Sequence, residues 1–156
     1  MAPVRTLFAA VLTFTLAQAA AAQKPVAIPT EDGGMVYADL YGEGQRAIVL
    51  AHGGPFNKES WEKQAQTLAD AGFRVLALDF RGYGKSRGPG DSNPLSAPLH
   101  LDVLASVRYL RKMGAKTVSV VGGSMGGSAA GDACIASHPG EIDRVVMLGA
   151  APNGPA

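Results

Sequence analysis

The sequence predicts an α/β fold in which helices cover both faces of a doubly wound, mostly parallel sheet. Four short apolar runs recur along the chain, at residues 47–51, 73–78, 117–121 and 145–148. Each lacks the polar–apolar alternation of a strand with one solvated face, as expected for strands that are buried on both faces. Helical stretches separate these runs, and such alternation of strand and helix is typical of a parallel sheet with covering helices.

Length and composition exclude several classes of protein. The chain has 156 residues, which allows one domain, and 47% of them are hydrophobic, too many for a disordered chain. The 14 Lys+Arg and 13 Asp+Glu leave no basic surface for nucleic acid. A single Cys excludes a disulfide framework and a multi-thiolate metal site. Because no cofactor motif is visible either, we expect no cofactor, no metal and no nucleic-acid partner.

Residues 1–22 have the features of a secretion signal. Arg5 provides a positive start, residues 7–17 are apolar, and Ala20-Ala21-Ala22 matches an A-x-A cleavage site. The apolar run is shorter than the ~20 residues that span a membrane, so no membrane span is expected. We therefore expect cleavage near Ala22, export to the periplasm or the medium, and an α/β domain over residues 23–156.

The first elements of this domain follow from turn and cap residues. Residues 26–29 and 35–41 flank a Glu-Asp-Gly-Gly turn at residues 31–34, a pattern that predicts a β-hairpin. After the first buried strand, Ser60 is expected to cap a helix that ends at Gly72.

Two further helices lie between the later strands. Residues 99–113 carry Leu and Val at helical spacing and stop at Gly114. Residues 125–137 are rich in Ala and Gly, so this helix can approach a sheet closely before Pro139 ends it. We expect Cys134, within this small-residue helix, to be buried.

Ser124 stands in a Gly-x-Ser-x-Gly pattern with Gly122 and Gly126, directly after the third apolar run and at the start of a helix. The pattern is typical of a sharp strand-to-helix turn that lifts a serine hydroxyl clear of the sheet. The helix N-terminus adds the Met125 N–H and a positive dipole end, both suited to a developing oxyanion. The alternative is a Gly-rich turn with an incidental serine.

His52-Gly53-Gly54 follows the first apolar run and so belongs to the same edge of a parallel sheet as Ser124. A glycine pair at this position exposes backbone N–H groups, which predicts the second half of an oxyanion hole. We expect His52 to orient this loop rather than to act as a base.

These motifs, in this order, resemble the α/β-hydrolase superfamily over about residues 47–148. The resemblance also includes the run Asp79-x-Arg81-Gly82-x-Gly84-x-Ser86, which is mostly structural in that family. It implies a serine hydrolase that cleaves ester or amide bonds of a small-molecule substrate through an acyl-enzyme. Carried onto this chain, the nucleophile is Ser124, in an elbow formed with Gly122 and Gly126, and the oxyanion donors are the N–H groups of Gly54 and Met125. Relatives that cleave carbon–halogen bonds have Asp in place of the serine.

The family's catalytic acid and His follow the nucleophile in the chain, after the seventh and eighth strands. This sequence ends at Ala156, after the sixth strand, and contains neither segment. His138 would lie about 20 Å from Ser124 at ~1.5 Å per helical residue, and His100 begins the preceding helix. Neither is expected to serve as the base. Because loss of the base costs about 10⁶ in kcat, we expect little or no hydrolase activity from this chain alone.

The sequence is therefore expected to be the amino-terminal part of a larger hydrolase: a fragment, the product of a truncated gene, or one of two complementary chains. Residues 145–148 would then form an exposed edge strand, which favours pairing with another chain. Two other functions stay open. One is a non-catalytic α/β-hydrolase-fold protein that binds a ligand or partner in the cleft, and the other is a fragment with no function.

Overall fold

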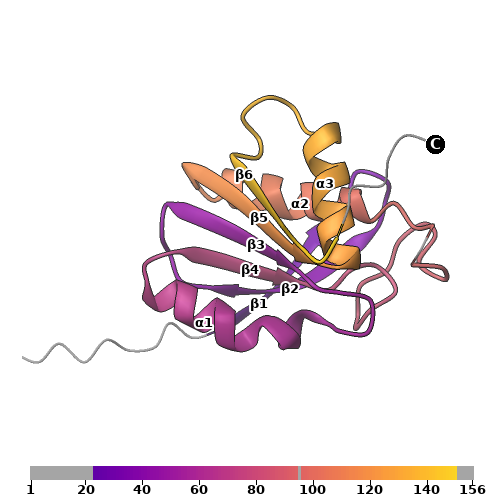
Figure 1. Ribbon diagram of the computed structural model, residues 1–156, viewed down its shortest axis with the longest axis horizontal. Helices are drawn as coiled ribbons and strands as arrows, with labels where there is room; N and C mark the ends of the chain where they lie inside the picture. Colours follow the sequence, from indigo (N-terminus) through magenta and orange to yellow (C-terminus); the bar gives the residue numbers. More distant parts are fainter. Residues whose placement is uncertain (1–22, 95, 151–156) are drawn as a thin grey trace, which may run out of the picture.

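A computed structural model describes residues 23–94 and 96–150, which form a six-stranded sheet with helices on both faces (Figure 1). The strands are β1 (Lys24–Pro29), β2 (Met35–Tyr41), β3 (Arg46–Ala51), β4 (Arg74–Leu78), β5 (Thr117–Gly123) and β6 (Arg144–Leu148). A 3-10 helix, η1 (Lys58–Trp61), leads into α1 (Glu62–Asp70), and the other helices are α2 (Leu99–Lys112) and α3 (Met125–Ala136). The predicted signal segment, residues 1–22, lies outside the described residues.

The strand order across the sheet is β1-β2-β4-β3-β5-β6. The predicted hairpin is present: β1 and β2 pair antiparallel, with Ile28 opposite Val36, and β2 pairs antiparallel with β4. The remaining neighbours, β4 with β3, β3 with β5 and β5 with β6, are all parallel. The doubly wound, mostly parallel sheet predicted from the four apolar runs is confirmed.

Two apolar layers lie on opposite faces of this sheet, because successive residues of a strand point to opposite sides. Val49 and Leu76 belong to the larger layer, under α2 and α3, whereas Leu50 and Val75 belong to the smaller layer, under α1 (Figure 1). All four side chains are at most 1% exposed, so β3 and β4 are buried on both faces as expected.

The outermost strand, β6, differs from that expectation. Its residues alternate between exposed and half-buried, and Val146 and Leu148 are 44% and 49% exposed. In the part of the chain that the structure describes, α3 covers one face of β6 and no helix covers the other. The strand is thus an exposed edge, as predicted, but it is not buried on both faces.

Two local predictions were wrong. Ser60 does not cap α1: it lies within η1, and its hydroxyl donates a hydrogen bond to the Asn57 carbonyl at 2.6 Å. A tertiary contact decides this turn, because the Lys58 N–H donates to the Asp79 carboxylate at 2.8 Å. Cys134 is exposed, since α3 turns Ala133 and its other small residues toward the protein and leaves Cys134 on the outer side.

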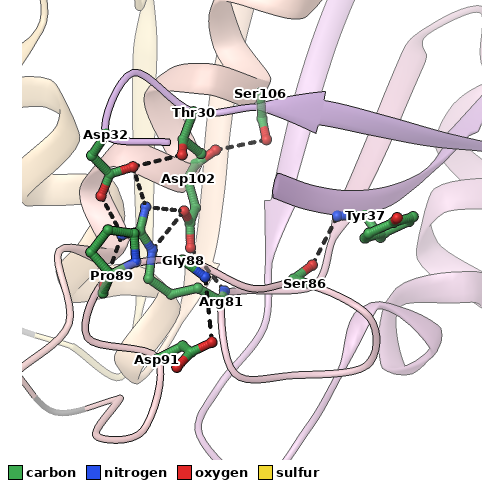
Figure 2. Close-up of polar contacts among 10 residues, drawn as sticks. All are labelled: Thr30, Asp32, Tyr37, Arg81, Ser86, Gly88, Pro89, Asp91, Asp102 and Ser106. Atoms are coloured by element: carbon green, nitrogen blue, oxygen red, sulfur yellow. Dashed lines mark hydrogen bonds and ion pairs between the residues drawn. The ribbon is translucent and has the colours of Figure 1, made fainter. Parts of the chain in front are cut away.

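A buried ion-pair network holds the hairpin turn and α2 against the end of β4 (Figure 2). The Arg81 side chain is fully buried and lies between two carboxylates. Its guanidinium donates to both oxygens of Asp32, in the β1–β2 turn, and to Asp102 Oδ1, on α2, at 2.7 and 3.0 Å. Nearby, the buried Ser86 hydroxyl accepts the Tyr37 N–H at 2.8 Å. The run from Asp79 to Ser86 therefore makes structural contacts, in keeping with what the resemblance implied.

Candidate active site

Ser124 occupies the turn between β5 and α3 with φ 49° and ψ −115°. It is the one non-glycine residue with a positive φ among residues 23–94 and 96–150. Such a backbone conformation costs of order 1–3 kcal/mol and occurs mainly where the position of a side chain matters for function. The geometry is that of the sharp strand-to-helix turn predicted from the Gly-x-Ser-x-Gly pattern.

Gly122 and Gly126 are required by close packing at this turn. A Cβ added to Gly122 would lie 2.1 Å from the Gly126 carbonyl oxygen. A Cβ added to Gly126 would lie 2.3 Å from the carbonyl oxygen of Ala51, at the end of β3. Any side chain at either position would push α3 away from the sheet and move Ser124 with it.

Backbone hydrogen bonds hold Ser124 from both sides. Its N–H donates to the Leu148 carbonyl of β6 at 2.8 Å, and its carbonyl accepts the N–H groups of Gly127 and Ser128 at 2.8 and 3.0 Å. The Met125 N–H is the first of α3, where N–H groups have no partner within the helix and the dipole is positive. It is therefore suited to receive negative charge that develops next to Ser124.

The peptide between Gly53 and Gly54 is held with its carbonyl oxygen turned into the loop. That oxygen accepts the Phe56 N–H at 3.0 Å and a hydrogen bond from His52 Nδ1 at 2.8 Å. In a trans peptide the C=O and N–H bonds point in opposite directions. The two hydrogen bonds therefore turn the Gly54 N–H away from the loop interior.

Gly53 and Gly54 also lie against the Ser124 turn. A Cβ added to Gly53 would be 3.6 Å from the Ser124 Cβ, and one added to Gly54 would be 4.0 Å from the Met125 Sδ. The structure thus brings together the five predicted residues: Ser124, its two elbow glycines, and the two residues expected to donate N–H groups. An oxyanion hole for acyl transfer requires N–H donors next to the nucleophile, so these residues are a candidate for such a site.

His52 uses both of its ring nitrogens within this loop. Nδ1 donates to the Gly53 carbonyl, and Nε2 accepts the Phe80 N–H at 3.2 Å, so the ring is neutral with its proton on Nδ1. The side chain is 1% exposed, and burial lowers the pKa of the imidazole. His52 therefore positions the loop, as expected, and has no nitrogen free to act as a base.

Tyr83 contacts both halves of the candidate oxyanion hole. Its hydroxyl donates to the Gly54 carbonyl at 2.8 Å and lies 3.8 Å from the Met125 Sδ, while its ring packs edge-on against His52. Sequence reasoning missed this residue. One available signal was its place between Gly82 and Gly84, both of which have positive φ and so allow a tight turn.

Lys58 is a second contact that the sequence did not predict. Its N–H donates to Asp79 at the end of β4, and its Nζ pairs with Asp39 of β2 at 2.8 Å. Both aspartates are at most 3% exposed as whole residues, and burial raises the pKa of Asp79. This brace fixes the far end of the loop that begins at His52.

Two cavities open beside Ser124. One, of about 320 Å³, is lined by Gly53, Phe56, Ser60, Trp61, Gln64, Gly123 and Ser124. The other, of about 260 Å³, lies between the start of α2 and α3, and its lining includes His100, Ser124, Ser128 and Asp132. The structure therefore places His100 in a cavity with Ser124, which sequence reasoning did not predict.

The third histidine, His138, is exposed beyond the end of α3, where its N–H donates to Glu141 at 2.9 Å. It is remote from Ser124, as expected. Within residues 23–94 and 96–150, no cluster of three His, Cys, Asp or Glu side chains could bind a metal ion. Nor does any helix of this described part have the length and apolar character needed to cross a membrane.

Comparison with known proteins gives consistent matches. Residues 46–156 match the family model of the alpha/beta hydrolase fold. A non-heme haloperoxidase from Rhodococcus erythropolis is 30% identical over 125 residues, which cover 80% of this chain and 44% of that protein. Bifunctional epoxide hydrolase 2 from Sus scrofa is 41% identical over 83 residues, which cover 52% of this chain and 14% of that protein.

Among solved structures, the esterase EaEST from Exiguobacterium antarcticum has a TM-score of 0.69 and 28% sequence identity. The match covers 82% of this chain and 46% of the esterase. This chain thus spans less than half the length of each of these three relatives.

Proposed function

This chain belongs to the α/β-hydrolase fold family, and on that premise we propose that it is part of a serine hydrolase that cleaves ester or amide bonds through an acyl-enzyme on Ser124. The observation that carries the proposal is the positive φ of Ser124 at a turn that lies against Gly53 and Gly54. A strained backbone at this point presents the hydroxyl to a substrate and is unexplained by packing alone.

The serine itself favours acyl transfer over the opening of an epoxide, a reaction named among the relatives. Attack by the Ser124 oxygen on an acyl carbon produces an ester, which water can hydrolyse to regenerate the hydroxyl. Attack on the saturated carbon of an epoxide would instead produce an ether, which water does not cleave under mild conditions. Ser124 can therefore complete a catalytic cycle on an ester or amide but not on an epoxide.

In the proposed reaction, the Ser124 Oγ attacks the substrate carbonyl carbon and loses its proton to a base. The carbonyl oxygen becomes an oxyanion that accepts the N–H groups of Gly54 and Met125. Collapse of this intermediate, with the proton passing from the base to the leaving group, expels the alcohol or amine and leaves the acyl group on Ser124. Water then attacks the acyl carbon, releases the carboxylic acid and returns a proton to Ser124.

Two of the three histidines of the chain cannot act as the base. His52 has both nitrogens bonded, and His138 is remote. We place the base in sequence that follows β6 in the whole protein, where the family resemblance puts its acid and His. His100 is the alternative within this chain, because it lines a cavity with Ser124.

Acyl-enzyme trapping with p-nitrophenyl acetate tests this function. An activated ester needs little help from an acid, so the purified chain should become acetylated at Ser124 and, without a base, should lose the acetyl group slowly. Peptide mass spectrometry should find the acetyl group on Ser124 and none at that peptide in Ser124→Ala. Ser128→Ala, which removes another hydroxyl from the same cavity, should be acetylated like the wild type.

His100→Gln separates the two sources of the base. If the base lies beyond β6, this variant should be acetylated at the wild-type rate, whereas a base at position 100 requires a rate at least tenfold lower. Equal acetylation of wild type and Ser124→Ala would refute the serine hydrolase. Ligand binding without acetylation would favour the alternative, a non-catalytic binding protein of the same fold.

We also propose that the whole protein is exported, on the strength of Arg5, the apolar residues 7–17 and the A-x-A site that ends at Ala22. Fusion of residues 1–22 to a reporter enzyme that is active only outside the cytoplasm checks this. The wild-type fusion should be active, and Leu7→Asp should abolish that activity. An inactive wild-type fusion would contradict export.

A further inference from the structure

The cavity of about 320 Å³ between the His52 loop, η1 and the end of β5, called here the Phe56–Trp61 cavity, differs in character from the rest of the site. We propose that it binds an apolar alkyl or phenyl group attached to the scissile carbonyl, so that the substrates are esters or amides with one such group. This inference rests on the proposed role of Ser124.

The lining of the Phe56–Trp61 cavity is uncharged, with two aromatic side chains as its walls. Its floor is made by Gly53 and Gly123, which have no side chains to fill it. A Cβ added to Gly53 would lie 3.3 Å from Phe56 Cδ2, and one added to Gly123 would lie 3.9 Å from Trp61 Cζ2. The glycines therefore leave room between the aromatic rings and Ser124, of a kind that favours apolar groups.

Trp61 forms a wall that is held by packing. Its ring packs against the apolar layer under α1 that contains Leu50 and Ala65. Among the described residues, its buried Nε1–H has no hydrogen-bond partner, so no polar bond sets the ring's position. A wall anchored in this way presents an apolar face to a group that lies next to Ser124.

The second cavity is more polar, although apolar residues such as Leu99 and Ala129 also line it. His100 and Asp132, both titratable, line it together with Ser124 and Ser128. Once the carbonyl oxygen lies between the N–H groups of Gly54 and Met125, the two remaining substituents of the carbonyl carbon must diverge. One substituent points to each cavity, and the uncharged Phe56–Trp61 cavity suits the apolar one, because an apolar group buried there leaves water without desolvating an ionisable side chain.

The test uses Trp61 as its own reporter, because it is the single Trp of the chain. Straight-chain alkylboronic acids, from methyl to butyl, are titrated into the full chain while Trp61 fluorescence and the ¹¹B NMR shift are recorded. The Ser124 oxygen adds to the trigonal boron, its proton passes to water, and the boron becomes a tetrahedral anion. Fluorescence thus reports binding in the Phe56–Trp61 cavity, and the boron shift reports the bond to Ser124.

We expect a saturable fluorescence change whose dissociation constant falls about fourfold for each added methylene, the effect of burying a CH₂ group. Phe56→Ala should flatten this dependence. Phe56 is 56% exposed, so its removal should leave the fold intact. Ile135→Ala, which removes a 77% exposed apolar side chain from α3, is the matched control and should keep the wild-type dependence.

The outcomes separate the cavity from the nucleophile. If the boron becomes tetrahedral but the dissociation constant does not depend on alkyl chain length, the cavity proposal is overturned and Ser124 stays the nucleophile. The same conclusion follows if Phe56→Ala shows the same dependence as the wild type. Chain-length dependence without tetrahedral boron would support the cavity and refute the nucleophile. Ser124→Ala should abolish the boron shift yet keep a weaker dependence on chain length. The absence of both signals in the folded wild type would overturn both proposals.

Discussion

His52 Nδ1 donates a 2.8 Å hydrogen bond to the Gly53 carbonyl, and through that peptide it sets the direction of the Gly54 N–H. The proposed oxyanion hole therefore depends on a side chain that does not touch the substrate. His52→Ala should lower the rate of Ser124 acetylation by about 10²–10³-fold, the usual cost of losing one oxyanion donor.

His52→Asn provides the control for that variant, because its side-chain amide can still donate toward the Gly53 carbonyl. Partial recovery of the acetylation rate is expected, with circular dichroism used to confirm that both variants are folded. An alanine variant that is folded and acetylated at the wild-type rate would show that His52 does not position the donor.

The same histidine predicts how stability depends on pH. Burial lowers the pKa of His52 below its ordinary value of 6.5, so the unfolded chain binds this proton at a higher pH than the folded chain. The free energy of unfolding should therefore fall as the pH drops below about 6.5 and should stop falling once the folded ring is protonated. Urea unfolding at pH 7.5 and pH 5 checks this. His52→Gln should show a smaller difference between the two, and an equal difference would assign the effect to other groups.

The buried pair of Arg81 and Asp102 predicts a large and specific loss of stability. Neither side chain is exposed, and the Nη2–Oδ1 distance is 2.7 Å. Asp102→Leu should lower the free energy of unfolding by about 3–5 kcal/mol, since it leaves a buried guanidinium with one carboxylate fewer.

The double variant Arg81→Met, Asp102→Leu removes both charges and should lose less stability than Asp102→Leu alone. Asp32→Asn completes this series by testing the other carboxylate that pairs with Arg81. The Asp32 carboxylate is 20% exposed, and the Arg81 guanidinium lowers its pKa to about 2. Urea denaturation measures all three variants, and a double variant that is less stable than Asp102→Leu would contradict a buried ion pair.

We expect alanine substitutions at neighbouring glycines of the Ser124 turn to differ strongly in their effect on stability. Gly122→Ala and Gly126→Ala should fail to fold or lose several kcal/mol, because their Cβ atoms would lie 2.1–2.3 Å from backbone oxygens. Gly123→Ala is the matched control, since its Cβ would meet nothing closer than 3.9 Å. Thermal unfolding of the three variants checks this, and equal melting temperatures would show that α3 does not pack as closely as described.

Much of the fold was predictable because the strands carry a local signal. β3 and β4 are buried on both faces, so their apolar runs could be identified without any knowledge of their neighbours. The same reasoning failed for the outer face of β6, which depends on what covers the sheet rather than on the strand. Ser60 was misassigned for a related reason: the contact of Lys58 with Asp79, 21 residues away in sequence, decides the local turn.

The candidate site was predictable only in part. The Ser124 turn follows from steric requirements at Gly122 and Gly126, which a short sequence pattern records. The contact of Tyr83 with Gly54, 29 residues away, leaves no such pattern. Likewise, the position of His100 in a cavity with Ser124 depends on where α2 starts, and a contact between α2 and the end of β4, through Asp102 and Arg81, contributes to that position.

Reaction with a fluorophosphonate, followed by peptide mass spectrometry, tests the central claim most directly, namely that Ser124 is a nucleophile presented by a strained turn. The predicted result is one phosphonyl group on Ser124, formed more slowly than in a complete serine hydrolase, absent from Ser124→Ala and retained in Ser128→Ala. A folded chain that carries the group on several serines alike, or on none after prolonged exposure, would contradict the claim.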